Sequence, residues 1–303
     1  MKSNSGQIQG VLPALLVPVT PDGATDIPLL TTQVKYLLDA GAHGIFVNGS
    51  TAESPYMSID EKVEVIRTVQ AVVQGNIPLF VACIQPSTRQ VLQELEAVAP
   101  LQPEFLVATT PFYFGITQQA ILDHYRVLAA ASSRPLLAYD IPSCTHNKIS
   151  CATMTALPEI PNIVGIKDSS GDMEKFTRAL HACSDSAFAW IQGNDYLDGS
   201  SLLSGAAALV TGTGNVDLTP YVDIWNAAQS GDIAGVWKAQ QRINHLCQVF
   251  ERAEGNVIPG IKSATAFLGR CTHHTRMSSM AVPEGYHGAI RGVLQEVGLL
   301  PAR

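Results

Sequence analysis

Residues 163–172 read IVGIKDSSGD, and this short stretch decides the fold class. A run of apolar and small residues leads to Lys167 and Asp168, and a polar turn with a glycine follows at once. Residues 172–183 then have the spacing of a helix, with Asp172 placed to cap its first turn. A buried strand followed by a loop and a helix is the repeating unit of parallel α/β folds. The stretch therefore predicts a βα unit with a lysine at the carboxyl end of its strand.

The same unit recurs along most of the chain. The predicted strands are residues 11–19, 44–49, 78–84, 105–110, 135–141, 163–167, 188–192 and 207–211. Helices are predicted between them, at residues 27–40, 59–73, 88–98, 117–131 and 172–183. Eight parallel strands with intervening helices favour a closed barrel over an open doubly wound sheet, which usually has fewer strands. The sequence thus predicts an α/β fold of the (β/α)8 TIM barrel type.

The strand pattern stops after about residue 219. Residues 232–252, 257–268 and 286–297 have helical spacing only. A barrel of this type commonly occupies about 250 residues as one unit, so the 303-residue chain has room for an appendage. We therefore expect a barrel domain with the active site at residues 1–230 and a C-terminal helical bundle at residues 231–303.

The composition excludes several classes of protein. With 46% hydrophobic and 15% charged residues, the chain can bury a large core and is neither disordered nor a coiled coil. A net charge of -7 and the absence of a basic run argue against nucleic acid as a partner. No apolar run approaches the roughly 18 residues of a membrane span, and the polar first ten residues do not resemble a signal peptide. We expect a cytoplasmic protein without membrane contact.

The cysteines and histidines do not indicate a metal site. The six cysteines include no CxxC pair, and we expect most of them to be reduced and buried. Cys271, His273 and His274 lie close together in sequence, but no second pair of ligands stands at a usual spacing. We expect neither a metal ion nor an organic cofactor.

Lys167 is the residue with the clearest chemical meaning, because active sites of such barrels lie at the C-terminal ends of the strands. It ends the apolar run 163–166, where a charged amine would lose its hydration inside the barrel mouth. Burial favours the neutral amine, which is the nucleophilic form. The alternative interpretation is a salt bridge between Lys167 and Asp168, or a side chain that extends to the surface.

Two other strand ends carry groups that suit a lysine nucleophile. Tyr139 ends the preceding strand, where its phenol could transfer protons, although a core tyrosine with a satisfied hydroxyl is an alternative. The loop Gly49-Ser50-Thr51-Ala52-Glu53 offers hydroxyl and backbone N–H donors that could hold a carboxylate. The same loop could instead be a helix N-cap with an acid in the first turn. Each signal alone is weak, and their combination is specific.

The motifs GSTAE, TPFY, YDIP and GIKDSS, in this order on successive strand ends, resemble the pyruvate-dependent class I aldolases of the dihydrodipicolinate synthase and N-acetylneuraminate lyase family. The resemblance covers nearly the whole chain and implies a barrel with a C-terminal helical bundle, usually in a homotetramer. It implies that Lys167 forms a Schiff base with pyruvate or another 2-oxo acid and that Tyr139 is the general acid/base. It further implies that Ser50 and Thr51 bind the carboxylate and join the proton relay. Tyr113 of TPFY matches a tyrosine that often completes this relay across a subunit contact.

Two departures from the family pattern bear on the substrate. Dihydrodipicolinate synthases typically carry an arginine, in a form like PSRTG, that holds the carboxylate of aspartate semialdehyde. This chain has Cys144 in that place, and a thiol cannot make the bidentate contact of a guanidinium. N-acetylneuraminate lyases have an acidic pair after the seventh strand, of which only Asp195 remains here. Our first hypothesis is therefore an aldolase for a 2-oxo-3-deoxy sugar acid.

Other residues at the strand ends are expected to line the substrate site. Gly49, Ser169, Gly193 and Val210 are assigned to it together with Cys144 and Asp195, and His146 either contacts substrate hydroxyls or lies in a surface loop. Residues 212–214, a Gly-Thr-Gly turn, could bind phosphate, but the resemblance explains them as a border of the substrate cavity.

Three alternative functions remain open at this stage. One is a dihydrodipicolinate synthase with altered substrate contacts, and another is a Schiff-base dehydratase or hydratase-aldolase that uses the same lysine. The third is a barrel that binds a sugar acid or phosphate without turnover.

Overall fold

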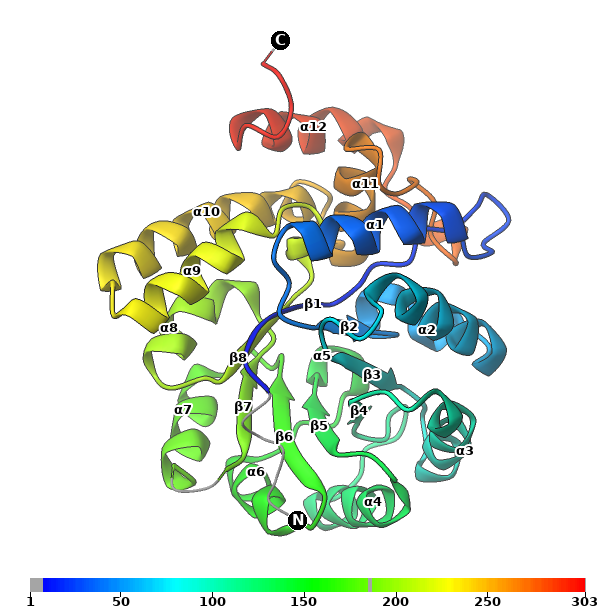
Figure 1. The fold of residues 1–303 in the computed structure, drawn as a ribbon, viewed down its shortest axis with the longest axis vertical. Helices are drawn as coiled ribbons and strands as arrows, with labels where there is room; N and C mark the ends of the chain where they lie inside the picture. Colours follow the sequence, from blue (N-terminus) through cyan, green and yellow to red (C-terminus); the bar gives the residue numbers. More distant parts are fainter. Residues whose placement is uncertain (1–7, 185–186, 303) are drawn as a thin grey trace.

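The fold is built around a ring of parallel strands (Figure 1). The computed structural model describes residues 8–184 and 187–302. Within them, eight strands follow one another around the ring: β1 (Gly10–Pro13), β2 (Ile45–Val47), β3 (Leu79–Cys83), β4 (Phe105–Thr109), β5 (Leu136–Asp140), β6 (Ile163–Asp168), β7 (Ala189–Gln192) and β8 (Ala208–Thr211). Strand β1 pairs with β8, with Gly10 opposite Ala208. The predicted barrel fold is confirmed.

The ring closes between β1 and β2 through only a few contacts. Ala14 and Phe46 form a parallel bridge, and the Leu15 amide donates to the Phe46 carbonyl at 2.9 Å. The sequence predicted a first strand at residues 11–19, but β1 ends at Pro13. Residues 14–19 are buried but form no ladder with a neighbouring strand. A short apolar run in a sequence indicates that its residues are buried, and it does not show that they pair with another strand.

Helices alternate with the strands, and most of them surround the ring on its outside, whereas the short helix after β5 lies at the mouth of the barrel (Figure 1). They are α1 (Ile27–Asp39), α2 (Ile59–Val73), α3 (Thr88–Val98), α4 (Gln118–Ala131), α5 (Pro142–Thr145), α6 (Cys151–Ala156), α7 (Met173–Ala182), α8 (Asp198–Leu203) and α9 (Thr219–Ser230). Side chains cap several of them at the expected residues: Ser58 and Glu61 form a capping box on α2, and Thr117 caps α4. Local sequence therefore fixes where these helices begin.

The apolar side chains form two separate cores. One fills the inside of the ring, where the Phe80 and Phe105 rings stack with their centroids 4.7 Å apart. The other lies between the strands and the surrounding helices and includes Ile166 and Phe176. A TIM barrel interior is packed by side chains in this way, so open space is confined to its ends.

Three further helices form the C-terminal part: α10 (Ile233–Glu251), α11 (Val257–Phe267) and α12 (His287–Glu296). Figure 1 shows α10 beside α9, and the Gly199 amide at α8 donates to Gln240 of α10 at 2.7 Å. These contacts attach the helical part to the barrel. The division of the chain at residue 230 stays a prediction.

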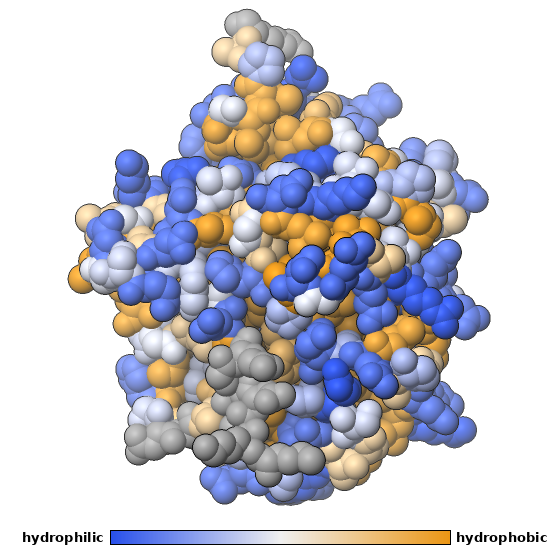
Figure 2. Space-filling model, in the orientation of Figure 1, coloured by the Kyte–Doolittle hydropathy of each residue, from blue (hydrophilic) through white to orange (hydrophobic). Residues whose placement is uncertain are grey.

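The surface in view is largely polar, with apolar patches, one of them over α12 (Figure 2). Across the described ranges, no helix combines the length and the apolar character needed to cross a membrane. Cys83, Cys247 and Cys271 are buried, whereas Cys144 is exposed.

Candidate functional site

An irregularity in β6 turns Lys167 into the barrel. Leu136 of β5 pairs with Ile163, but the next residue, Leu137, pairs with Gly165, so that Val164 is an extra residue in β6. Val164 packs inside the ring and Ile166 packs outside it, which a regular strand could not do for residues two apart. After this bulge the alternation brings Lys167 to the inside.

The Lys167 amine lies between two aromatic rings. Its Nζ atom is 4.1 Å from the centroid of the Tyr139 ring and 4.3 Å from that of Phe46. Tyr139 is directly opposite Lys167 in the ladder, as the order of the strands suggested. Only 5% of Lys167 is exposed. The side chain is therefore desolvated in the barrel mouth.

Lys167 differs from the other buried lysines. In the described part of the chain, four lysines are buried, and three of them form ion pairs: Lys62 with Glu94, Lys175 with Asp140 and Asp168, and Lys262 with Glu53. Lys167 has no carboxylate partner among residues 8–184 and 187–302, and Asp168 pairs with Lys175 at 3.3 Å. The alternative of a Lys167–Asp168 salt bridge is therefore wrong.

A cavity of about 350 Å³ opens above the Lys167 amine. Most of the residues assigned to the site from the sequence line this cavity: Ser50, Thr51, Tyr139, Cys144, Lys167, Ser169, Gly193, Asp195 and Val210. They come from loops and strand ends that are far apart in sequence. The C-terminal edge of the barrel brings them together, as expected for this fold.

The loop after β2 presents unused donors to this cavity. Ser50 and Thr51 begin the 3-10 helix η2 (Ser50–Ala52), and neither their hydroxyls nor their amides bond to any residue that the structure describes. Glu53 ends this turn in a left-handed conformation at φ 58°. Its carboxylate pairs with Lys262 and accepts from the Arg276 amide at 2.8 Å. The loop is thus fixed at its base while its donors stay available for an anion.

Three residues assigned from the sequence do not line the cavity. Gly49 lies beside it, where a Cβ atom would come within 2.7 Å of the Phe46 ring, so glycine there makes room for that ring. His146 is exposed at the end of α5 with φ 58°. Tyr113 is 81% exposed and has the unusual φ of 82°. Their roles toward a substrate stay predictions.

Several cavity residues were not found from the sequence. Phe250, Val257 and Ile258 reach the cavity from α10 and α11, and Asn194 and Tyr196 from the loop after β7. Nothing in the helical spacing of residues 232–268 distinguishes a cavity wall from an ordinary core face. Phe46, which contacts the Lys167 amine, was also not singled out, although it lies in the predicted strand 44–49.

The described cavity lining has one carboxyl group, that of Asp195, and one basic residue. Asp195 Oδ2 accepts from the Thr213 amide at 3.3 Å and from the Thr213 hydroxyl, while Oδ1 has no hydrogen-bond partner among the described residues. Burial raises the pKa of the Asp195 carboxyl, and the hydrogen bonds from Thr213 oppose this rise. Lys167 is the one basic residue on the described lining. The cavity therefore combines free hydroxyl and amide donors at Ser50 and Thr51 with a single basic residue, Lys167.

Comparisons with known proteins agree with this geometry. Residues 7–295 match the model of the dihydrodipicolinate synthetase family. The chain is 30% identical over 293 residues to an uncharacterized DapA-like lyase of Halobacterium salinarum, covering 97% of this chain and 95% of that protein. It is 28% identical to a 4-hydroxy-tetrahydrodipicolinate synthase of Bifidobacterium animalis subsp. lactis, covering 96% of this chain and 94% of that protein.

The fold is also similar to solved structures of this family. The chloride-inhibited dihydrodipicolinate synthase of Acinetobacter baumannii, complexed with pyruvate, has a TM-score of 0.92 at 27% identity, covering 97% of this chain and 100% of that one. The dihydrodipicolinate synthase of Thermotoga maritima has a TM-score of 0.91 at 25% identity, with 97% and 100% of the two chains covered. The chain therefore belongs to the dihydrodipicolinate synthetase family of aldolase-type carbon–carbon lyases.

Proposed function

We propose that the protein is a Schiff-base-forming class I aldolase that cleaves or forms a 2-oxo acid, with pyruvate as one of the two carbonyl compounds. The observation that carries this proposal is the buried Lys167 amine without a carboxylate partner, at the base of an open cavity. An ion-paired lysine would be held in its protonated form, which is not nucleophilic. A buried amine without a counterion at this position is suited to act as a nucleophile.

The reaction begins when the neutral Lys167 amine attacks the ketone carbon of a 2-oxo acid whose carboxylate is held by Ser50 and Thr51. Tyr139 passes protons as the carbinolamine loses water and becomes a protonated imine. The imine accepts the electron pair of the C3–C4 bond as that bond breaks, and the C4 hydroxyl loses its proton to give an aldehyde. The remaining enamine is protonated at C3, and water releases pyruvate and the free lysine. Synthesis follows the same steps in reverse.

For the carbonyl partner we propose an uncharged, hydroxylated aldehyde, so that the substrate is a 2-oxo-3-deoxy sugar acid. Asn194 and Ser143 supply polar side chains to the cavity lining. A second carboxylate would share the cavity with Asp195, and the described lining offers no basic residue other than Lys167 to pair with it. This disfavours aspartate semialdehyde, although a dihydrodipicolinate synthase with altered contacts is the alternative that the names of relatives support. A Schiff-base dehydratase would use the same lysine.

We further propose that Tyr113 acts at a contact between copies of the chain in a homotetramer. An 81% exposed tyrosine with φ 82°, in edge contact with the 75% exposed Phe114, is costly to leave in water. Light scattering should give the mass of a tetramer, and Tyr113→Asp should shift the protein to smaller species. A wild-type mass of one chain at working concentration would exclude this proposal.

Reductive trapping tests the nucleophile. Borohydride added with pyruvate should inactivate the protein and leave a covalent adduct on Lys167, located by peptide mass spectrometry. Lys167→Ala should form no adduct and lose turnover while its thermal unfolding midpoint stays at or above the wild-type value, because the change removes a desolvated amine. Lys238→Ala, at an exposed lysine, is the matched control and should be trapped normally. An adduct on another lysine, or none, would show that the proposed chemistry is wrong.

Tyr139→Phe tests the proton transfer. The change keeps the ring against Lys167 and removes only the hydroxyl, so turnover should fall by roughly 10²–10⁴-fold, the usual contribution of a positioned acid/base. Steady-state kinetics with pyruvate release as the signal measure this. Near-normal turnover would mean that the phenol is structural and that another group moves the proton.

Cys144→Arg tests the choice of substrate. In the wild-type protein, aspartate semialdehyde should react with pyruvate some two to four decades more slowly than a hydroxylated aldehyde, because a buried carboxylate without a partner costs about 3–5 kcal/mol. Cys144→Arg should raise the rate with aspartate semialdehyde and lower it with the hydroxylated aldehyde, whereas Cys144→Ser should change neither preference. A wild-type preference for aspartate semialdehyde would overturn the proposed substrate class and leave the Schiff-base chemistry intact.

A further inference from the structure

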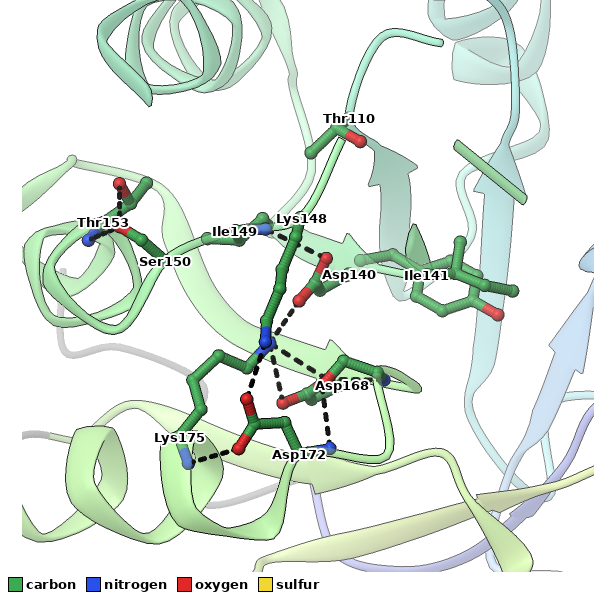
Figure 3. Close-up of polar contacts among 12 residues, drawn as sticks. Thr110, Asp140, Ile141, Lys148, Ile149, Ser150, Thr153, Asp168, Asp172 and Lys175 are labelled. Atoms are coloured by element: carbon green, nitrogen blue, oxygen red, sulfur yellow. Dashed lines mark hydrogen bonds and ion pairs between the residues drawn. The ribbon is translucent and has the colours of Figure 1, made fainter. Parts of the chain in front are cut away.

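We propose that Lys175 is a positioning residue: with Asp140 and Asp168 it forms a buried cluster that holds β5 and β6 in the register that brings Lys167 and Tyr139 together. The inference rests on the proposed function for what Lys167 and Tyr139 do, and it assigns a role to a lysine that does not contact the cavity. The Asp140–Lys175–Asp168 cluster lies on the outside of the barrel, behind the strand ends that carry the site (Figure 3).

The contacts tie two strands to one helix. Lys175 of α7 donates to the Asp140 carboxylate and lies 3.3 Å from Asp168 Oδ2. The side chains are 5%, 0% and 2% exposed for Lys175, Asp140 and Asp168 respectively. Asp140 also accepts from the Ile149 amide at 3.1 Å, and Asp168 accepts from the Ser170 amide at 2.8 Å. Each carboxylate thus has one charged and one backbone partner, although Asp168 Oδ2 has only its ion pair with Lys175 and no hydrogen bond among the described residues.

The two aspartates directly follow the two residues of the site. Tyr139 precedes Asp140, and Lys167 precedes Asp168. In the β5–β6 ladder, Tyr139 lies opposite Lys167 and Asp140 lies opposite Asp168. Because successive side chains of a strand point to opposite faces, a carboxylate fixed outside the ring fixes the preceding side chain inside it. Lys175 therefore holds Tyr139 and Lys167 toward each other across the strands.

The register between β5 and β6 is not determined by regular strand alternation alone. The bulge at Val164 lies three residues before Lys167, and without it the alternation would exchange the faces of Lys167 and Asp168. A slip of one residue would then place a carboxylate in the cavity and the lysine outside. The Asp140–Lys175–Asp168 cluster forms only in the bulged register, so its ion pairs favour the arrangement in which Lys167 faces inward.

The position of Lys175 on its helix supports this role. It is the third residue of α7, and its amide donates to the capping side chain of Asp172 at 2.9 Å. A cation in the first turn is disfavoured by the positive end of the helix dipole. The two aspartates account for a lysine there, and they are the only partners of its ammonium among the described residues.

The cluster has one cation for two carboxylates. Burial raises the pKa of the Asp140 carboxyl, Lys175 opposes this rise, and the charge of Asp168 adds to it. The nearest further cation is Lys148, which is half exposed and pairs with Asp172 at 2.6 Å (Figure 3). Lys175 is therefore the group whose loss leaves both buried carboxylates without compensation.

The test compares Lys175→Met with two companion variants. Lys175→Arg keeps a cation in place, and the triple variant Lys175→Met/Asp140→Asn/Asp168→Asn removes all three charges while its amide oxygens can still accept from Ile149 and Ser170. We expect the rate of borohydride-trapped adduct formation at saturating pyruvate to fall roughly 10²-fold in Lys175→Met and in the triple variant, as for a reacting group misplaced by about 1 Å. The KM for pyruvate should stay near its wild-type value, because the Ser50–Thr51 loop is untouched. Lys175→Arg should recover most of the lost rate.

Lys62→Met is the matched control for general destabilisation. Lys62 is equally buried and pairs with Glu94 at 2.9 Å, but it joins α2 to α3 and does not tie the strands of the site. It should lower the thermal unfolding midpoint as Lys175→Met does, and leave the rate of adduct formation of the folded protein unchanged. Equal losses of rate in both variants would contradict the inference, as would a folded triple variant with the wild-type rate.

A crystal structure of the triple variant separates this inference from the proposed function. We expect the distance from Lys167 Nζ to the Tyr139 ring centroid, 4.1 Å in the wild-type chain, to increase. An unchanged distance would overturn the positioning role whether or not the protein forms a Schiff base. Failure of the proposed function would appear separately, as wild-type protein that gives no adduct on Lys167.

Discussion

An amine held inside a ring of parallel strands, without a carboxylate beside it, is the constraint on which the rest of this structure depends. Every other buried lysine of the described chain is neutralised by at least one acid, and each of these pairs lies outside the ring. Lys167 has only the faces of Phe46 and Tyr139 around its amine. Contact with aromatic faces compensates a cation less than an ion pair does.

The surrounding charges are arranged so that none reaches that amine. Asp168 is adjacent to Lys167 in sequence, but the alternation of β6 turns its carboxylate to the other face of the sheet, where Lys175 holds it. Glu53 closely follows the Ser50–Thr51 loop, and its carboxylate pairs with Lys262 and accepts from the Arg276 amide. These ion pairs stabilise the barrel, and they also keep the carboxylates of Asp168 and Glu53 away from the Lys167 amine. Structural and chemical roles are thus shared by the same residues.

The cavity is lined partly by the barrel and partly by the helices that follow it in the chain. The strand ends supply the Lys167 amine, the Tyr139 phenol and the Ser50–Thr51 loop, to which the proposed Schiff-base chemistry is assigned. Phe250, Val257 and Ile258 of α10 and α11 close the side of the cavity beyond the barrel. In the proposed reaction, a substrate that extends past its ketone would meet these helices and Cys144.

The sequence alone determined the periodic features of this protein. Eight short apolar runs between helical segments predicted the barrel, and the polar residues that end those runs predicted Ser50, Thr51, Tyr139 and Lys167 as one site. The fold prediction is confirmed, and the four residues line one cavity, because strand spacing and the common edge of parallel strands follow general rules. The chemical roles of these four residues stay predictions. Only the tertiary structure decided the rest. The bulge at Val164, which turns Lys167 inward, depends on the pairing of β6 with β5, and the cavity wall of α10 and α11 depends on how those helices pack on the barrel. Neither feature produces a periodic pattern in the sequence. The bulge results from a single residue inserted into a ladder, and the cavity wall results from contacts between segments that are far apart in the chain.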